Sequence, residues 1–255
     1  MSLILATGGT GRLGTAITSI LHEQTRGTSF EWLPLGSKDI DITDLDSVET
    51  VISHHRPKVA LHLAAYTDVA KAGDDRQTCW DLNVVGTRNV AAIAAKQGAR
   101  VVHISTDYVF WGGSDRPPNG YRETDPVGPV RNYYALTKLV AEEAAQRDPN
   151  NVIVRTSFRP SEWPYPSAFS DLYTSQDYVD VIAKEIILLL TNLNQVKEPC
   201  LHIGTERKSV YDLVKRRNPE VKAGSRMDID VNLPHDISLD SSLWNHVRAS
   251  FQPAY

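Results

Sequence analysis

The stretch SLILATGGTGRLG, residues 2–14, joins a short apolar run to a glycine loop and then to a helical period. Residues 2–7 are apolar enough for a buried strand, and Gly8, Gly11 and Gly14 follow at intervals of three. Between a strand and a helix, the first glycine permits a tight turn, the second lets the backbone approach a pyrophosphate, and the third allows close packing of helix on strand. Free N–H groups at the helix start attract the anion. The stretch therefore predicts a dinucleotide site rather than a merely structural turn.

Apolar runs and helical periods alternate beyond this loop, as in a parallel sheet covered by helices on both faces. We predict a doubly wound α/β fold: a Rossmann domain over residues 1–157, then a small, reduced substrate-binding region over residues 158–255 that is interleaved with the last Rossmann elements. The segment 157–169, SFRPSEWPYPSAF, predicts an irregular connection without regular pairing, because proline restricts the backbone. The predicted strands are residues 2–7, 30–35, 59–64, 99–105, 151–157 and 200–203, and the predicted helices start near Leu13 and cover 45–55, 75–96, 132–147, 177–193 and 209–217.

Composition excludes several classes of protein. The net charge is −4 and the only tight basic cluster is residues 215–217, so we expect no nucleic-acid partner. Cys79 and Cys200 are the only cysteines, which rules out a disulfide framework, and no metal-ligand spacing is present. The N-terminus lacks a basic signal region, and the apolar runs are too short to cross a bilayer. We expect a cytoplasmic protein without a metal or a membrane contact.

The end of the second predicted strand bears on cofactor choice. An acidic residue about 20 positions after the glycine loop would bond the ribose 2′-OH of NAD. Residues 33–38, LPLGSK, contain no acid, and Ser37 and Lys38 are suited to a 2′-phosphate together with Arg12. The alternative is that Lys38 is only solvated. This stretch favours NADPH, with NADH also possible.

Residues 132–140, NYYALTKLV, place two tyrosines shortly before a lysine. Residues four apart share a helix face, so Tyr134 lies beside Lys138, whereas Tyr133 pairs with Thr137. An ordinary surface pair is the alternative interpretation of this spacing.

The stretch HISTDYVF, residues 103–110, spans the carboxyl end of the fourth predicted strand. In an open α/β sheet this edge faces the ligand crevice. Neighbouring strand residues point to opposite faces, so we expect only one of Ser105 and Thr106 to reach the site.

Together these segments resemble the extended short-chain dehydrogenase/reductase family, and in particular the dTDP-4-dehydrorhamnose reductases. The resemblance is strong over residues 1–157. It is carried by TGGTGRLG (7–14), DITD (41–44), LHLAAYT (61–67), AAYTDVAKA (64–72), Asn83 in LNVVGT, STDYVF (105–110) and Tyr134-x-x-x-Lys138.

The resemblance implies a catalytic group of three residues. Thr106 would hydrogen-bond the substrate carbonyl oxygen, and Tyr134 would donate a proton to that oxygen as hydride arrives from the nicotinamide. Lys138 would bind the nicotinamide ribose and lower the pKa of Tyr134 from its ordinary value of ~10.

The resemblance also implies binding residues. The cofactor set comprises the glycine loop with Arg12 and Leu13, then Ser37 and Lys38, Asp41 and Ile42 beside the adenine, Ala64, Ala65 and Tyr66 along the cofactor, and Asn83 with the Tyr134–Lys138 pair. The substrate set comprises Thr67, Val69, Asp107, Tyr108, Phe158 and Trp163.

The chain departs from the reductase pattern in three places. Ala70 stands where the reductases usually have an acid, Phe158 where they have a tryptophan, and the segment between Phe158 and Asp171 is shorter than usual. Trp163 or Tyr165 would then cover the sugar in place of a lid, or pack into a small satellite core.

The activity implied is NAD(P)H-dependent reduction of the 4-keto group of a nucleotide-linked 4-keto-6-deoxyhexose, with the nucleotide sugar as partner and a homodimer left open. One alternative is a sugar-nucleotide epimerase or dehydratase. The pair Asp107-Tyr108 after Thr106, in place of Asp-Glu, disfavours the dehydratase. The other alternative is a non-catalytic cofactor-binding regulatory subunit. The intact Thr106, Tyr134 and Lys138 disfavour this alternative, whereas the short substrate region favours it.

Overall fold

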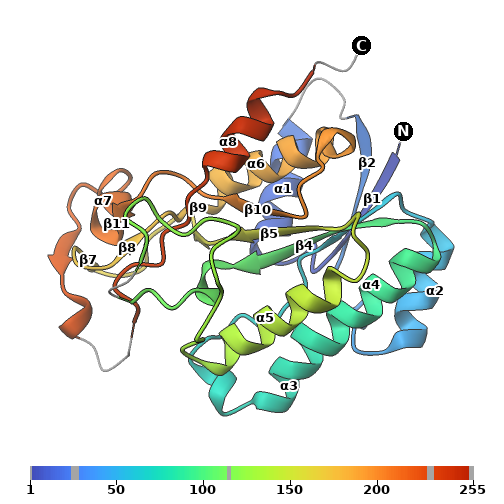
Figure 1. Cartoon of the computed structure of the whole chain (residues 1–255), viewed down its shortest axis with the longest axis horizontal. Coiled ribbons are helices and arrows are strands. Elements are labelled where there is room, and N and C mark those ends of the chain that lie inside the picture. Colours follow the sequence, from blue (N-terminus) through green and yellow to red (C-terminus); the bar gives the residue numbers. More distant parts are fainter. Residues whose placement is uncertain (1, 24–28, 114–115, 229–232, 253–255) are drawn as a thin grey trace.

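Six parallel strands form one central sheet in the computed structural model of the protein, which describes residues 2–23, 29–113, 116–228 and 233–252 (Figure 1). The strand order is β10-β5-β4-β3-β1-β2, so the order reverses between β1 and β3, where α/β proteins place their ligand crevice. All the predicted strands are confirmed, although the third is two residues shorter than predicted. Their bounds are β1 Ser2–Thr7, β2 Phe30–Leu35, β3 Val59–His62, β4 Arg100–Thr106, β5 Val152–Thr156 and β10 Cys200–Ile203.

Helices cover both faces of the sheet, which confirms the doubly wound fold (Figure 1). Ile4 and Ala6 of β1 pack into one apolar cluster, whereas Leu5 between them packs into the other, because strand side chains alternate between faces. One layer contains α1 (Arg12–Glu23), α6 (Val179–Thr191) and α8 (Ser242–Ala249), and the other contains α2 (Leu45–His55), α4 (Gly86–Lys96) and α5 (Tyr133–Ala145). Within the described ranges, every helix lacks the length or the apolar character needed to cross a membrane.

The predicted single helix over residues 75–96 is interrupted. It consists of α3 (Arg76–Trp80), a π-helical turn η2 (Asp81–Val85), and then α4. Asn83 lies buried in the wider turn, where its side chain bonds groups on two other segments. Such turns recur at functional sites and leave no mark in the apolar periodicity.

A small lobe lies beside the carboxyl ends of the strands (Figure 1). The prediction that 157–169 lacks regular pairing is wrong at both ends of that segment. β6 (Phe158–Arg159) pairs with β9 (Asp177–Tyr178), and β7 (Ser167–Phe169) pairs with β12 (Lys222–Gly224). The three prolines fall between the two short strands, where they interrupt no ladder. The other elements are β8 Tyr173–Thr174, β11 Lys208–Ser209, α7 Val210–Lys215, η1 Lys71–Gly73, η3 Asp107–Val109, η4 Leu193–Gln195 and η5 Arg226–Asp228.

The lobe has its own apolar cluster, built from Ala168, Leu172, Val210, Val214 and Val221. In the same region 158–255, β10 is the edge strand of the main sheet, and α6 and α8 pack on that sheet. The boundary after residue 157 and the interleaving of the two regions stay predictions.

Candidate active site

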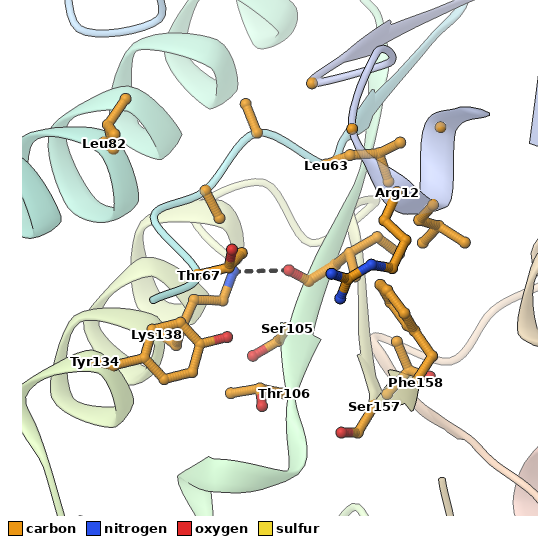
Figure 2. Close-up of a pocket in the computed structure, with 18 of the residues that line it drawn as sticks. Arg12, Leu63, Thr67, Leu82, Ser105, Thr106, Tyr134, Lys138, Ser157 and Phe158 are labelled. Carbon is orange, nitrogen blue, oxygen red and sulfur yellow. Dashed lines mark hydrogen bonds between the residues drawn. The ribbon is translucent and has the colours of Figure 1, made fainter. Parts of the chain in front are cut away.

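The carboxyl ends of β1, β3, β4 and β5 open onto one cavity of about 810 Å³ (Figure 2). The cavity runs from the glycine loop to α5 and to the residues that follow β5. Most of the sequence-predicted site residues lie on its wall. They are Gly8, Gly11, Arg12, Leu13, Gly14, Ser37, Asp41, Ile42, Ala64, Ala65, Thr67, Val69, Thr106, Tyr108, Tyr134, Lys138 and Phe158.

The glycine loop is tight enough to exclude side chains. Gly8 has φ +67°, and a Cβ added there would lie 2.6 Å from the backbone nitrogen of Ala64. The Gly11 N–H donates to the Gly8 carbonyl at 2.9 Å and closes the turn just before α1 begins at Arg12. The start of α1 therefore faces the cavity, in the arrangement that suits a pyrophosphate.

Helix α5 presents Tyr134 to the cavity and turns Tyr133 away from it. The Asn132 side chain caps the helix by accepting from the Ala135 N–H at 2.8 Å, which fixes where the turns begin. Tyr134 and Lys138 are one turn apart and both buried. Tyr133 lies instead against the guanidinium of Arg76, 5.4 Å from its ring centre.

The Lys138 ammonium is held by the end of β4. Its Nζ donates to the Ile104 carbonyl at 2.7 Å (Figure 2) and lies 3.4 Å from His103 Nε2. Burial lowers the pKa of Lys138 to about 8, while Glu142 opposes that shift. The lysine therefore keeps its proton at neutral pH and loses it in mild alkali.

Burial also raises the pKa of Tyr134, although the Thr106 hydroxyl opposes the shift. The expected lowering of the Tyr134 pKa by Lys138 is not met in this structure, where desolvation dominates at the phenol and the pKa is raised. A neutral phenol beside Thr106 is a proton donor over the whole physiological range.

Asn83 and Tyr66 lie behind the cavity wall rather than on it. Asn83 Oδ1 accepts from the Tyr66 N–H at 2.8 Å, and Asn83 Nδ2 donates to Thr137 Oγ1 at 2.9 Å. The amide thus ties residues 64–67 to the helix that carries Tyr134. The structure gives Asn83 a supporting position and no contact with the cavity.

Three further predicted residues are not on the wall. Lys38 is exposed at the surface. Asp107 is fully buried beside Thr106, and burial raises the pKa of its carboxyl to about 6. Trp163 packs against the satellite cluster, with its indole N–H donating to the Ser167 carbonyl at 3.0 Å. The structure therefore does not bring Trp163 to the place where it would cover a sugar.

Sequence reasoning missed several wall residues. Ser105 lines the cavity together with Thr106, contrary to the expectation that one would, because the cavity wraps around the end of β4 (Figure 2). The Ser105 hydroxyl itself donates to Glu142 on α5. Position after a strand was the available signal for Thr156, Ser157 and Arg159, whereas nothing in the sequence marked Gln176. The wall also includes Thr10, Gly36, Ile40, Leu63, Leu82 and Ile104.

This geometry places the chain in the extended short-chain dehydrogenase/reductase class, because the Tyr134–Lys138 pair and the end of β4 meet in the cavity that the glycine loop opens. Comparison with known proteins makes the assignment narrower. Residues 1–187 match the family model described as RmlD substrate binding domain, and the chain belongs to that family.

Two curated relatives illustrate the similarity. The dTDP-4-dehydrorhamnose reductase of Mycobacterium tuberculosis (strain CDC 1551 / Oshkosh) is 34% identical over 185 residues, which are 71% of this chain and 55% of that protein. The enzyme of the same name from Aggregatibacter actinomycetemcomitans is 31% identical over 189 residues, or 73% of this chain and 62% of that protein. The match thus spans about half the length of the curated relatives, between 45% and 62%.

Solved structures extend the similarity over the whole fold. A dTDP-4-dehydrorhamnose reductase of Clostridium acetobutylicum superposes with a TM-score of 0.83 at 25% identity, covering 96% of this chain and 92% of that one. The dTDP-4-dehydrorhamnose reductase of Bacillus anthracis, solved in complex with NADP, superposes with a TM-score of 0.82 at 25% identity, covering 98% of this chain and 92% of that one.

Proposed function

We propose that the chain is an NADPH-dependent reductase of the 4-keto group of a nucleotide-linked 4-keto-6-deoxyhexose. One observation carries the proposal: a single cavity joins the glycine loop to Thr106, Tyr134 and Lys138. A hydride donor anchored at the loop and a carbonyl beside Tyr134 can therefore meet. Relatives that bear the reductase name support the choice of substrate class.

The residues present suit NADPH. The glycine loop and the start of α1 would hold the pyrophosphate, and Asp41 and Ile42 would flank the adenine. Arg12 and Ser37 lie on the wall where a 2′-phosphate would need donors. The nearby Asp39 carboxylate accepts from the Gly36 N–H at 2.8 Å, so this acid is engaged with its own turn.

When bound, NADPH supplies the hydride that reduces the carbonyl carbon. The protein's own residues supply position and the proton. Thr106 and Tyr134 would both hydrogen-bond the carbonyl oxygen, and Tyr134 would transfer its phenolic proton to the developing alkoxide. Because burial raises the pKa of Tyr134, the phenol stays protonated until that moment. Lys138 would hold the ribose hydroxyls and place a positive charge beside the site.

The test is NADPH consumption by the purified chain with a dTDP-4-keto-6-deoxyhexose as substrate. Stoichiometric consumption supports the proposal. NADPH binding without any consumption would favour the regulatory-subunit alternative, and conversion of the sugar without consumption would favour an epimerase or a dehydratase. A cytoplasmic location and a homodimer stay predictions.

A further inference from the structure

Arg159 enters the cavity wall directly after β5. It is the second residue of β6, whose pairing with β9 sets Phe158 opposite Asp177 and Arg159 opposite Tyr178. Phe158 packs against the apolar cluster on the α1 and α6 side of the sheet. Because neighbouring strand residues point to opposite sides, Arg159 is turned from that cluster and lies with its guanidinium 5.6 Å from the ring centre of Trp163.

The Arg159 guanidinium contacts the Trp163 ring but keeps a hydrogen-bond donor that has no acceptor among the residues that the structure describes. Its Nε is buried and makes no hydrogen bond there, and no carboxylate of the described chain lies within ion-pair distance of it. Arginine keeps its charge at every physiological pH. A buried donor without an acceptor is costly, and an oxyanion is the ligand that matches the planar fork of a guanidinium.

A second unsatisfied atom lies behind the cavity wall, next to Thr106. Asp107 Oδ2 is buried without a hydrogen-bond partner in the described residues, while Oδ1 accepts from Thr106 at 3.2 Å. The Arg159 charge acts on Asp107, yet the two side chains form no ion pair. Of these two residues, Arg159 lines the cavity and Asp107 does not, so the guanidinium is the group that a ligand with acceptor oxygens can reach.

That space lies apart from the glycine loop. Two strands, β3 and β4, separate β1 from β5 in the sheet. Neighbouring strands are about 4.8 Å apart, so the loop after β1 and the chain after β5 are separated by roughly 14 Å. An anion at Arg159 would therefore lie on the β5 side of the cavity, whereas the pyrophosphate would lie at the glycine loop after β1.

We propose that Arg159 recognises an oxyanion of the substrate and so determines its specificity, with Trp163 positioning the guanidinium from outside the cavity. This inference rests on the proposed reductase function. The oxyanion is either the diphosphate of a nucleotide-linked sugar or the carboxylate or phosphate of a smaller carbonyl compound. We take the diphosphate as the favoured source, because curated relatives act on dTDP-linked sugars by name.

The test compares Arg159→Gln and Arg159→Lys with the wild type, all saturated with NADP⁺, and titrates dTDP, thymidine and malonate. Arg147, which is exposed and outside the cavity, supplies the control Arg147→Gln. If the recognised oxyanion is a diphosphate, Arg159→Gln should weaken dTDP binding about tenfold or more, and Arg159→Lys should weaken it less. The affinities for thymidine and for NADPH should be unchanged in both variants. Preferential binding of malonate over dTDP, lost in Arg159→Gln, would support the smaller substrate.

Two results would overturn the inference. One is dTDP and malonate binding by Arg159→Gln at wild-type strength. The other is a loss of NADPH affinity in Arg159→Gln equal to its loss of dTDP affinity, which would assign Arg159 to the cofactor.

Melting temperatures of all variants identify a folding defect. Arg159→Lys keeps the charge and the aliphatic part of the side chain if the glutamine variant is unstable. Failure of the wild type to bind NADPH would refute the proposed function, whereas an unchanged Arg159→Gln refutes the anion site alone.

Discussion

Burial acts in opposite directions on the two α5 residues that face the cavity. It raises the pKa of Tyr134 and lowers that of Lys138, because in each case desolvation penalises the charged form. The pair is thus a neutral acid beside a cation that is held by a backbone carbonyl. Their side-by-side placement follows from residue spacing and could be predicted. Their protonation could not, because it depends on depth of burial, which four-residue spacing does not encode.

Tyr134→Phe should reduce turnover by ~100- to 10,000-fold, the usual contribution of general acid catalysis, while NADPH affinity stays within a few-fold. Tyr133→Phe is the matched control and should be nearly silent, since that ring lies against Arg76 outside the cavity. Steady-state rates and fluorescence titration with NADPH check both variants. An inactive Tyr133 variant beside an active Tyr134 variant would refute the assignment of helix faces.

Cofactor preference depends on the cavity wall formed by the start of α1 and the residues after β2. Wild-type protein should bind NADPH more tightly than NADH, and Arg12→Ala should reduce that preference several-fold, because Arg12 lies on the cavity wall. Lys38→Ala is the control and should change the preference little, since Lys38 is exposed and off the wall. Equal or tighter binding of NADH by the wild type would remove the 2′-phosphate interpretation altogether.

At the scale of elements, strand–loop–helix context was enough to predict the sheet, the glycine loop and the ends of β4 and α5. The π-helical turn at Asn83 was missed, because the apolar residues before and after it keep an apparently continuous helical period. Arg159 and Gln176 were missed for a different reason. Arg159 lies in the two-residue strand β6, and Gln176 directly precedes the two-residue strand β9, with which β6 pairs; tertiary contacts rather than local pattern set this pairing. Asn83 was identified only through resemblance, and its supporting role required the structure.

The glycine loop permits a test that separates backbone strain from close approach. Gly8 and Gly98 both have positive φ, +67° and +68°, but a Cβ meets Ala64 at Gly8 and nothing within 4 Å at Gly98. Gly98→Ala should lower the unfolding free energy by about 1 kcal/mol. Gly8→Ala should cost more and also weaken NADPH binding at least tenfold. Urea unfolding and NADPH titration measure both effects, and equal behaviour of the two variants would contradict a close-fitting phosphate loop.

The whole molecule combines a complete Rossmann body with a small lobe at its ligand edge, and its interior holds several neutral histidines. Burial lowers the pKa of His62 and of His202 to about 3 each. The folded state keeps these rings neutral while the unfolded chain binds protons below pH ~6.5, so stability is lost as pH falls from 6.5 toward 3. Asp107, with a folded pKa of about 6, acts in the opposite direction as pH falls from 6 toward 4.

The histidines should dominate this balance. At pH 5, two such histidines lower the stability by roughly 4 kcal/mol together, against a gain on the order of 1 kcal/mol at Asp107. The melting temperature should therefore fall as the pH is lowered from about 7.5 to about 5. The melting temperature of His202→Gln should fall less steeply than that of the wild type. Thermal unfolding in buffers of equal ionic strength provides the comparison. Parallel pH dependence of the two proteins would show that His202 is not a source of the acid sensitivity.

The central claim is that this fold transfers hydride from NADPH to a sugar carbonyl and that Tyr134 protonates the oxygen. The most direct measurement is NMR of the product formed from a dTDP-4-keto-6-deoxyhexose with NADPH deuterated at the transferable position of the nicotinamide. We expect the wild type and Tyr133→Phe, but not Tyr134→Phe, to form a product with one deuterium at carbon 4 of the sugar. A product without deuterium at that carbon, or an unchanged sugar beside fully bound NADPH, would contradict it.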